Sequence, residues 1–164
     1  MVLPIVAYGN PVLRKVGMEI SPDYPGLQKL VEDMWETMYN SKGVGLAAPQ
    51  VNKEIRLFVI DSIQILDNLE EDEKDDYPGD DGYKGVFINA EVQETDGEEW
   101  PYNEGCLSIP KVREDISRPA QVTMRWMDEN FIEHEETFSG ITARVILHEY
   151  DHIEGKLKIA IQCH

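Results

Sequence analysis

The sequence predicts an α+β fold in which antiparallel β-sheets pack around a central late helix, with a second helix near the N-terminus. Apolar residues recur every three or four positions in residues 26–41 and 141–154, which is the period of a helix. Short runs rich in β-branched and aromatic residues, typical of strands, cover residues 55–60, 85–89, 121–126 and 131–138.

Size and composition favour one domain spanning residues 1–164. A hydrophobic fraction of 41% and a charged fraction of 29% are those of an ordinary globular protein. The net charge of −17 argues against the broad basic face that a nucleic-acid binder needs, so we expect no DNA partner. No apolar run reaches the roughly 18 residues that cross a bilayer, and the first residues do not resemble a secretory leader. We therefore expect no membrane contact. The two cysteines, Cys106 and Cys163, are too few for a disulfide framework, which favours a cytoplasmic protein, and we expect a monomer.

The first helix, residues 26–41, begins after Pro25 and presents one apolar face. The segment GVGLAAPQ, residues 43–50, follows it. Its two glycines allow backbone conformations that are closed to other residues, so we predict a structured loop.

An acidic stretch, residues 61–84, separates the first two strands and carries ten acidic residues against two lysines. We predict an inserted, solvated loop here, because so few of its residues are apolar. A specific docking role is the alternative. Four apolar side chains are candidate anchors for its first half: Ile63, Ile65, Leu66 and Leu69.

The last two strands, 121–126 and 131–138, predict a hairpin, with Asp128 and Asn130 supplying turn chemistry between them. The late helix, residues 141–154, follows directly, and Gly155 is a natural C-terminal stop. This helix carries the sequence HEYDH, residues 148–152.

The spacing of His148 and His152 places two imidazoles on one face of a helix, about one turn apart, where both can bind one metal ion. Glu149 lies between them in sequence and can reach a metal-bound water without being a ligand. This is the pattern of a hydrolytic metal site. Plain solvated residues are the alternative.

A catalytic site of this kind usually has three protein ligands, so one more is needed. A third histidine ten residues after His148 is ruled out, because Lys158 stands there. Cys106 is the remaining candidate, since a thiolate binds Zn or Fe(II) well. A buried core cysteine is equally consistent with the chemistry of Cys106.

Three motifs together resemble the signature motifs of the peptide deformylase family, in that family's order: GVGLAAPQ (43–50), EGCLS (104–108) and HEYDH (148–152). The resemblance implies a metallohydrolase that removes the N-formyl group from the formyl-methionine of newly made polypeptides and releases formate. It implies nascent chains as partners and one divalent metal ion, with Fe(II) favoured in the cell and Zn, Ni or Co as alternatives.

Carried over by motif, the metal ligands are Cys106, His148 and His152, and Glu149 is the general base and then the general acid. The Gln50 side chain and the Leu107 backbone N–H stabilise the oxyanion.

The resemblance also gives substrate contacts. Gly45 and Arg113 bind the substrate backbone. An apolar pocket for the methionine side chain is expected from Val44, Ile141 and Val145, with simple core packing as the alternative for these residues.

The chain departs from the family pattern at Leu147, where many members have glutamine, so this position offers no polar side chain to the metal ligands. The chain also stops soon after Gly155, where family members commonly continue with an element that in some bacteria helps ribosome docking. That docking element is not carried over to this chain, and we expect at most a transient ribosome contact.

Overall fold

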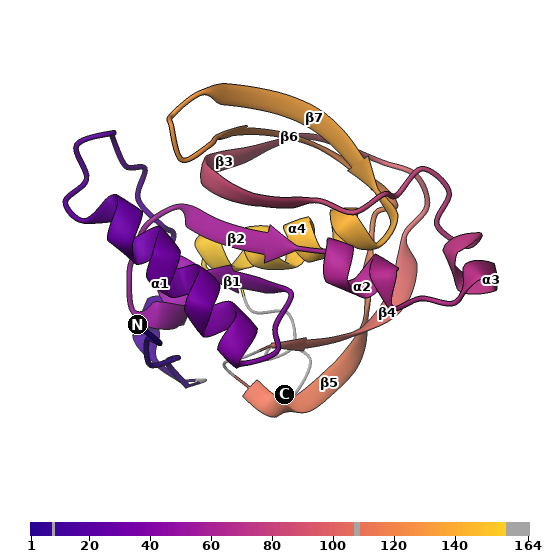
Figure 1. Ribbon diagram of the computed structural model, residues 1–164, viewed down its shortest axis with the longest axis horizontal. Coiled ribbons are helices and arrows are strands. Elements are labelled where there is room, and N and C mark those ends of the chain that lie inside the picture. The colour runs from indigo at the N-terminus through magenta and orange to yellow at the C-terminus, as the bar shows by residue number, and fades with distance from the viewer. Residues whose placement is uncertain (8, 107–108, 157–164) are drawn as a thin grey trace.

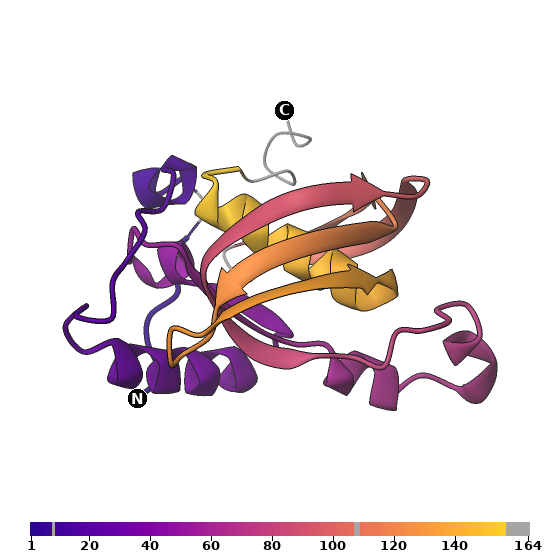
Figure 2. The same cartoon turned by 90° about the horizontal axis from the view of Figure 1, so that it is seen from above.

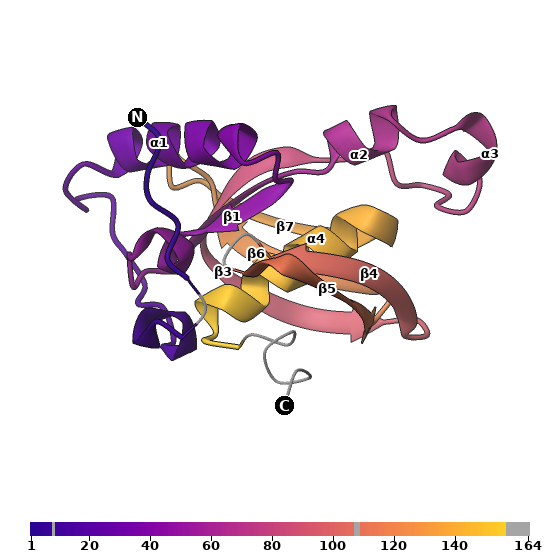
Figure 3. The same cartoon turned by 90° about the horizontal axis from the view of Figure 1, so that it is seen from below.

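The molecule consists of a five-stranded antiparallel sheet, a separate two-stranded ladder, and helix α4 (Gly140–Ile153) between them (Figure 1). The structure is a computed structural model that describes residues 1–7, 9–106 and 109–156, and only the backbone among 105–114. Figures 2 and 3 show the molecule from opposite sides. In Figure 2 the strands of the five-stranded sheet lie in front of α4, and in Figure 3 the two-stranded ladder lies in front of it. The predicted α+β fold with a central late helix is confirmed.

The five-stranded sheet has the order β1-β2-β3-β6-β7, and all neighbours are antiparallel. Its strands are β1 (Gly45–Ala47), β2 (Leu57–Asp61), β3 (Lys84–Asp96), β6 (Gln121–Met127) and β7 (Glu133–Ser139). The predicted hairpin is confirmed, because β6 and β7 pair along their whole length, from Gln121 opposite Ser139 to Met127 opposite Glu133.

Strand β2 is buried on both faces, which explains its continuous apolar sequence. Leu57 and Val59 belong to the cluster that packs on helix α1 (Leu27–Asn40), while Phe58 and Ile60 belong to the cluster that packs on α4. Successive side chains of a strand point to opposite faces, so one strand joins both halves of the core. Helix α1 matches the predicted first helix.

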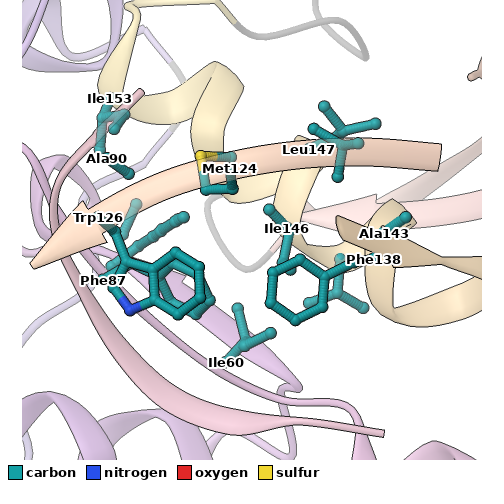
Figure 4. Packing of buried hydrophobic residues seen from close by; sticks show 14 of the residues in the cluster. Ile60, Phe87, Ala90, Met124, Trp126, Phe138, Ala143, Ile146, Leu147 and Ile153 are labelled. Carbon is teal, nitrogen blue, oxygen red and sulfur yellow. The ribbon is translucent and has the colours of Figure 1, made fainter. Parts of the chain in front are cut away.

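The core around α4 is built on aromatic residues of the sheet. Phe87 packs 4.8 Å from Phe58 and 4.6 Å from Trp126, measured between ring centroids. Figure 4 shows Phe87 and Trp126 in the same cluster as Ile146 of α4, which is fully buried. Leu147, the departure from the family pattern, is also buried in this cluster and makes an apolar contribution to it.

The ladder of β4 (Trp100–Cys106) and β5 (Ile109–Arg118) has no counterpart in the sequence-based predictions. Its described side chains do alternate between buried and exposed, but two of the buried ones are charged, Glu104 and Arg118. The apolar alternation that predicts a strand is therefore absent from both sequences.

Two other segments differ from expectation. The segment 43–50 is not all loop, since it contains β1 and part of the 3₁₀ helix η2 (Ala48–Val51). Another 3₁₀ helix, η1 (Pro11–Arg14), lies near the N-terminus.

Residues 61–84, expected as a solvated loop, contain α2 (Ile63–Asp67) and α3 (Glu71–Lys74). Leu66 is buried, Ile65 and Leu69 pack on the core, and Ile63 is exposed. Among the described residues, no helix is long and apolar enough to cross a bilayer.

Candidate metal centre

The motif HEYDH lies in the second half of α4, as its spacing predicts. The rings of His148 and His152 are 5.1 Å apart between centroids. His152 is almost fully buried, and this burial lowers its pKa well below the usual value, with the nearby His148 adding to the effect. His152 is therefore neutral, which is the form of imidazole that binds metals.

Glu104 of β4 orients His148. Its Oε1 atom lies 2.8 Å from His148 Nδ1. A ring nitrogen held in this way fixes the tautomer and directs Nε2 as the ligand atom. Burial alone would raise the pKa of Glu104, but hydrogen bonds from His148 and Arg118 outweigh burial and hold it at about 2. Glu104 is therefore a carboxylate at any ordinary pH.

The Glu104 carboxylate is part of a buried ionic network. Arg118 donates from Nε and Nη2 to its two oxygens at 2.8 and 2.9 Å, and Arg144 donates to it as well. Arg118 also donates to Asp151 at 2.8 Å. Two guanidinium groups thus balance two carboxylates, which is the condition under which buried charges are tolerated. This network joins β4, β5 and α4.

Glu149 is buried beside the His148 imidazole, with its Oε2 atom 4.0 Å from His148 Nε2. Burial raises its pKa to about 7. Its Oε1 atom is shielded from solvent and has no hydrogen-bond partner among the described residues. A buried acid with an unsatisfied oxygen and a pKa near neutrality is typical of a group that exchanges protons.

Gly45 of β1 lies directly against Glu149. A Cβ added to Gly45 would be 2.7 Å from Glu149 Oε2 and 2.9 Å from its Cγ. Only glycine therefore allows the β1 backbone to approach the carboxylate this closely.

Gln50 of η2, three residues after the end of β1, is almost fully buried. Its Oε1 accepts a hydrogen bond from the Ala47 backbone N–H at 2.9 Å. The carbonyl end of the amide is thereby fixed, so the side chain has a defined orientation.

The three expected pocket residues come together in the structure. Ile141 and Val145 are buried members of the cluster around α4, and Val44 packs against that cluster. This placement is consistent with both alternatives for the three residues, simple core packing and the wall of a methionine pocket.

Three expected site residues are only partly described. Cys106 is the last residue of β4, two residues after Glu104, and its backbone pairs with Ile109. Arg113 lies in β5 opposite Gly105. The side chains of Cys106 and Arg113, and all of Leu107, lie outside the described residues. The described residues contain no group of three metal-ligating side chains.

The sequence-based reasoning missed the roles of Glu104, Arg118 and Arg144. Arg144 had a signal, since it precedes His148 by four residues and so shares its helix face. Glu104 stands inside a motif already singled out, and a ligating histidine needs a partner for its second nitrogen. Arg118 had no local signal, because its contacts come from distant parts of the chain.

The fold and this helix define the class of metal-dependent hydrolases. The family model for polypeptide deformylase matches residues 2–161, and the chain belongs to this family. The chain is therefore an enzyme of the deformylase type.

Relatives and solved structures agree. A peptide deformylase of Flavobacterium johnsoniae is 56% identical over 159 residues, which cover 96% of this chain and 80% of that protein. One from Christiangramia forsetii is 54% identical over the same shares. The crystal structure of peptide deformylase from Thermotoga maritima superposes with a TM-score of 0.81 at 35% identity, covering 98% of this chain and 97% of that one.

Proposed function

We propose that this enzyme removes the formyl group from the N-terminal formyl-methionine of newly made polypeptides and releases formate. The observation that carries the proposal is the placement of Glu149. Its carboxyl group is buried, has a pKa raised to about 7, and lies 4.0 Å from His148 Nε2 and directly against Gly45 of β1.

The residues present fit a divalent metal ion. Burial keeps His152 neutral, and Glu104 orients His148 through Nδ1. We propose His148, His152 and Cys106 as the ligands. Cys106 follows Glu104 by two residues, so β4 brings its backbone near α4. When bound, the ion supplies a Lewis acid that lowers the pKa of a water molecule. The proposed metal is Fe(II), because thiolate and imidazole ligands suit it, with Zn, Ni or Co as alternatives.

Glu149 moves the proton in both halves of the proposed reaction. As a carboxylate it accepts a proton from the attacking water, and as the acid it donates that proton to the departing amine nitrogen. A pKa near the working pH suits a group that must do both.

Gln50 and Leu107 are the proposed oxyanion donors. The Ala47 N–H donates to the carbonyl oxygen of Gln50, so the orientation of the amide is fixed and its NH₂ group is the end that carries donors. The backbone N–H of Leu107 is the second donor, and loss of one such donor typically costs about 10²–10³ in rate.

Substrate recognition is proposed to use β1 and the first half of α4. Gly45 and Arg113 bind the substrate backbone. Val44, Ile141 and Val145 contact the methionine side chain, as their common apolar cluster supports.

The test is anaerobic formate release from a formyl-Met peptide by the metal-loaded enzyme, with an N-acetylated peptide and an internal amide as controls. We expect release from the formyl peptide alone. Glu149→Gln should lower kcat by about 10²–10⁴, while Glu129→Gln, at an exposed position, should keep the wild-type rate. Absence of formate with the wild-type enzyme would overturn the proposal.

Metal content tests the ligand set. Cys106→Ser should purify with far less bound metal than the wild type, whereas Glu149→Gln should retain it. An unchanged metal content in Cys106→Ser would remove Cys106 from the ligands.

We also propose that residues 1–164 form one domain and that the enzyme acts in the cytoplasm as a monomer on nascent chains, with transient ribosome contact. The site lies between elements from across the chain, which supports a single folding unit.

A further inference from the structure

The acidic segment 61–84 is attached to the first turn of α4. Thr142 lies in that turn and is almost fully buried. Its backbone N–H donates to Asp80 Oδ2 at 3.0 Å, and its hydroxyl donates to Asp80 Oδ1 at 2.5 Å. A carboxylate that accepts from the first turn of a helix satisfies an otherwise unpaired N–H and complements the helix dipole.

Both ends of the segment meet at the same threonine. Ser62 Oγ lies 2.7 Å from Thr142 Oγ1 and accepts from the Tyr83 backbone N–H at 2.9 Å. The Ser62 N–H donates to the Tyr83 carbonyl at 3.0 Å. The segment therefore closes on itself at Thr142 and is not a freely solvated insertion.

Gly140 shows how tight this contact is. It has a φ of +63°, and a Cβ added there would lie 2.8 Å from Asp80 Oδ2. The first residue of α4 and the Asp80 carboxylate can occupy these positions only because residue 140 has no side chain.

The apolar side of the segment packs on the core cluster that contains two of the proposed pocket residues. Leu66 is buried in the cluster that contains Ile141 and Val145, and Leu69 and Tyr77 pack against this cluster. Tyr77 also lies 5.8 Å from Trp100 of β4, between ring centroids. The segment thus contacts the first turn of α4 through Asp80 and the start of β4 through Tyr77.

We infer that Asp80 is a positioning residue for recognition of the substrate's first side chain, because it fixes the turn of α4 that carries the pocket wall. The inference rests on the proposed function. Thr142 follows Ile141 directly and precedes Val145 by three residues, so fixing Thr142 fixes both. His148 lies six residues beyond Thr142, about 9 Å along the helix, and is held separately by Glu104.

The experiment compares kcat and KM for formyl-Met and formyl-Ala peptides in the metal-loaded enzyme. Asp80→Asn keeps the side-chain shape, Asp80→Ala removes the carboxylate, and Thr142→Val removes the hydroxyl. Asp81→Asn is the matched control, because Asp81 is the exposed neighbour with the same charge. We expect the Asp80 and Thr142 variants to lose about tenfold in preference for formyl-Met, the scale of a methylene-sized change in an apolar pocket. The loss should appear in KM, with kcat and metal content unchanged.

The outcomes are distinguishable. If the Asp80 and Thr142 variants melt at lower temperature but keep the wild-type preference and KM, Asp80 is only structural and the inference fails. An equal loss in Asp81→Asn would also overturn it. Should Asp80→Ala fail to fold, the milder Asp80→Asn and Thr142→Val still decide. If the wild type releases no formate from either peptide, the proposed function itself has failed.

Discussion

At the scale of single residues, Gly45 makes a sharp prediction. In Gly45→Ala, the new Cβ would displace the Glu149 carboxyl, which lies 2.7 Å away. We expect the fold and the metal content to survive, because the end of a side chain can move. Formate release should fall by about 10²-fold, as for a misplacement near 1 Å. Activity assays with metal analysis of the same sample check this, and a wild-type rate would show that Glu149 tolerates displacement.

Glu104 gives a second prediction at this scale. Glu104→Gln removes the negative charge that faces Arg118, Arg144 and His148, and breaking a buried ion pair typically costs about 3–5 kcal/mol of stability. Metal affinity should fall by about 10–100-fold, because His148 loses a charged partner. Urea denaturation and competition with a chelator measure the two effects. Glu94→Gln, at an exposed position of β3, should change neither.

At the scale of elements, packing of the sheet on α4 depends on Phe87, which contacts aromatic rings from β2 and β6. Phe87→Ala should lower the free energy of unfolding by about 3–5 kcal/mol, through lost transfer free energy and an unfilled cavity. Ile132→Ala removes a side chain that is 58% exposed and should cost under about 0.5 kcal/mol. Urea denaturation measures both free energies of unfolding. If Phe87→Ala and Ile132→Ala lowered the free energy of unfolding equally, the core would not depend on the Phe87 ring.

The sequence predicted those elements whose pattern has one physical cause. Helices α1 and α4 each bury an apolar stripe, and β2 is apolar on both faces, so local spacing was enough to find them. The ladder was missed because Glu104 and Arg118 occupy buried positions that a pattern search assigns to apolar residues. Those charges are buried only because they meet across the fold, which local sequence cannot show.

The same limit applied to the site. The spacing of His148 and His152 and the motif around Gln50 were local. The structure buries Gln50 and His152 and places His148 Nε2 4.0 Å from the buried Glu149. The bond from Thr142 to Asp80 joins residues 62 positions apart, so composition suggested a solvated loop where the structure has a docked one. Charge density alone does not show which acid is bound to a helix.

At the scale of the whole molecule, 32 acidic residues stand against 15 basic ones. Self-repulsion of such a surface destabilises the compact state, and salt screens it over about 10 Å at 0.1 M. Exposed ion pairs are worth about 1 kcal/mol or less each, so little stability is lost when salt screens them. We therefore expect the Tm to rise by a few degrees between roughly 10 and 200 mM NaCl, since 1 kcal/mol shifts the Tm of a chain this size by about 2–4 °C.

Thermal melts of a variant that neutralises the exposed acids of α3, with Glu71→Gln, Asp72→Asn and Glu73→Gln, provide the control. This variant should melt higher than the wild type at low salt and respond less to added NaCl, because part of the repulsion is gone. The buried Glu104 network is shielded from ions and should contribute equally at both salt concentrations. A wild-type Tm that falls with salt would mean that attractive surface pairs outweigh the repulsion of the −17 net charge.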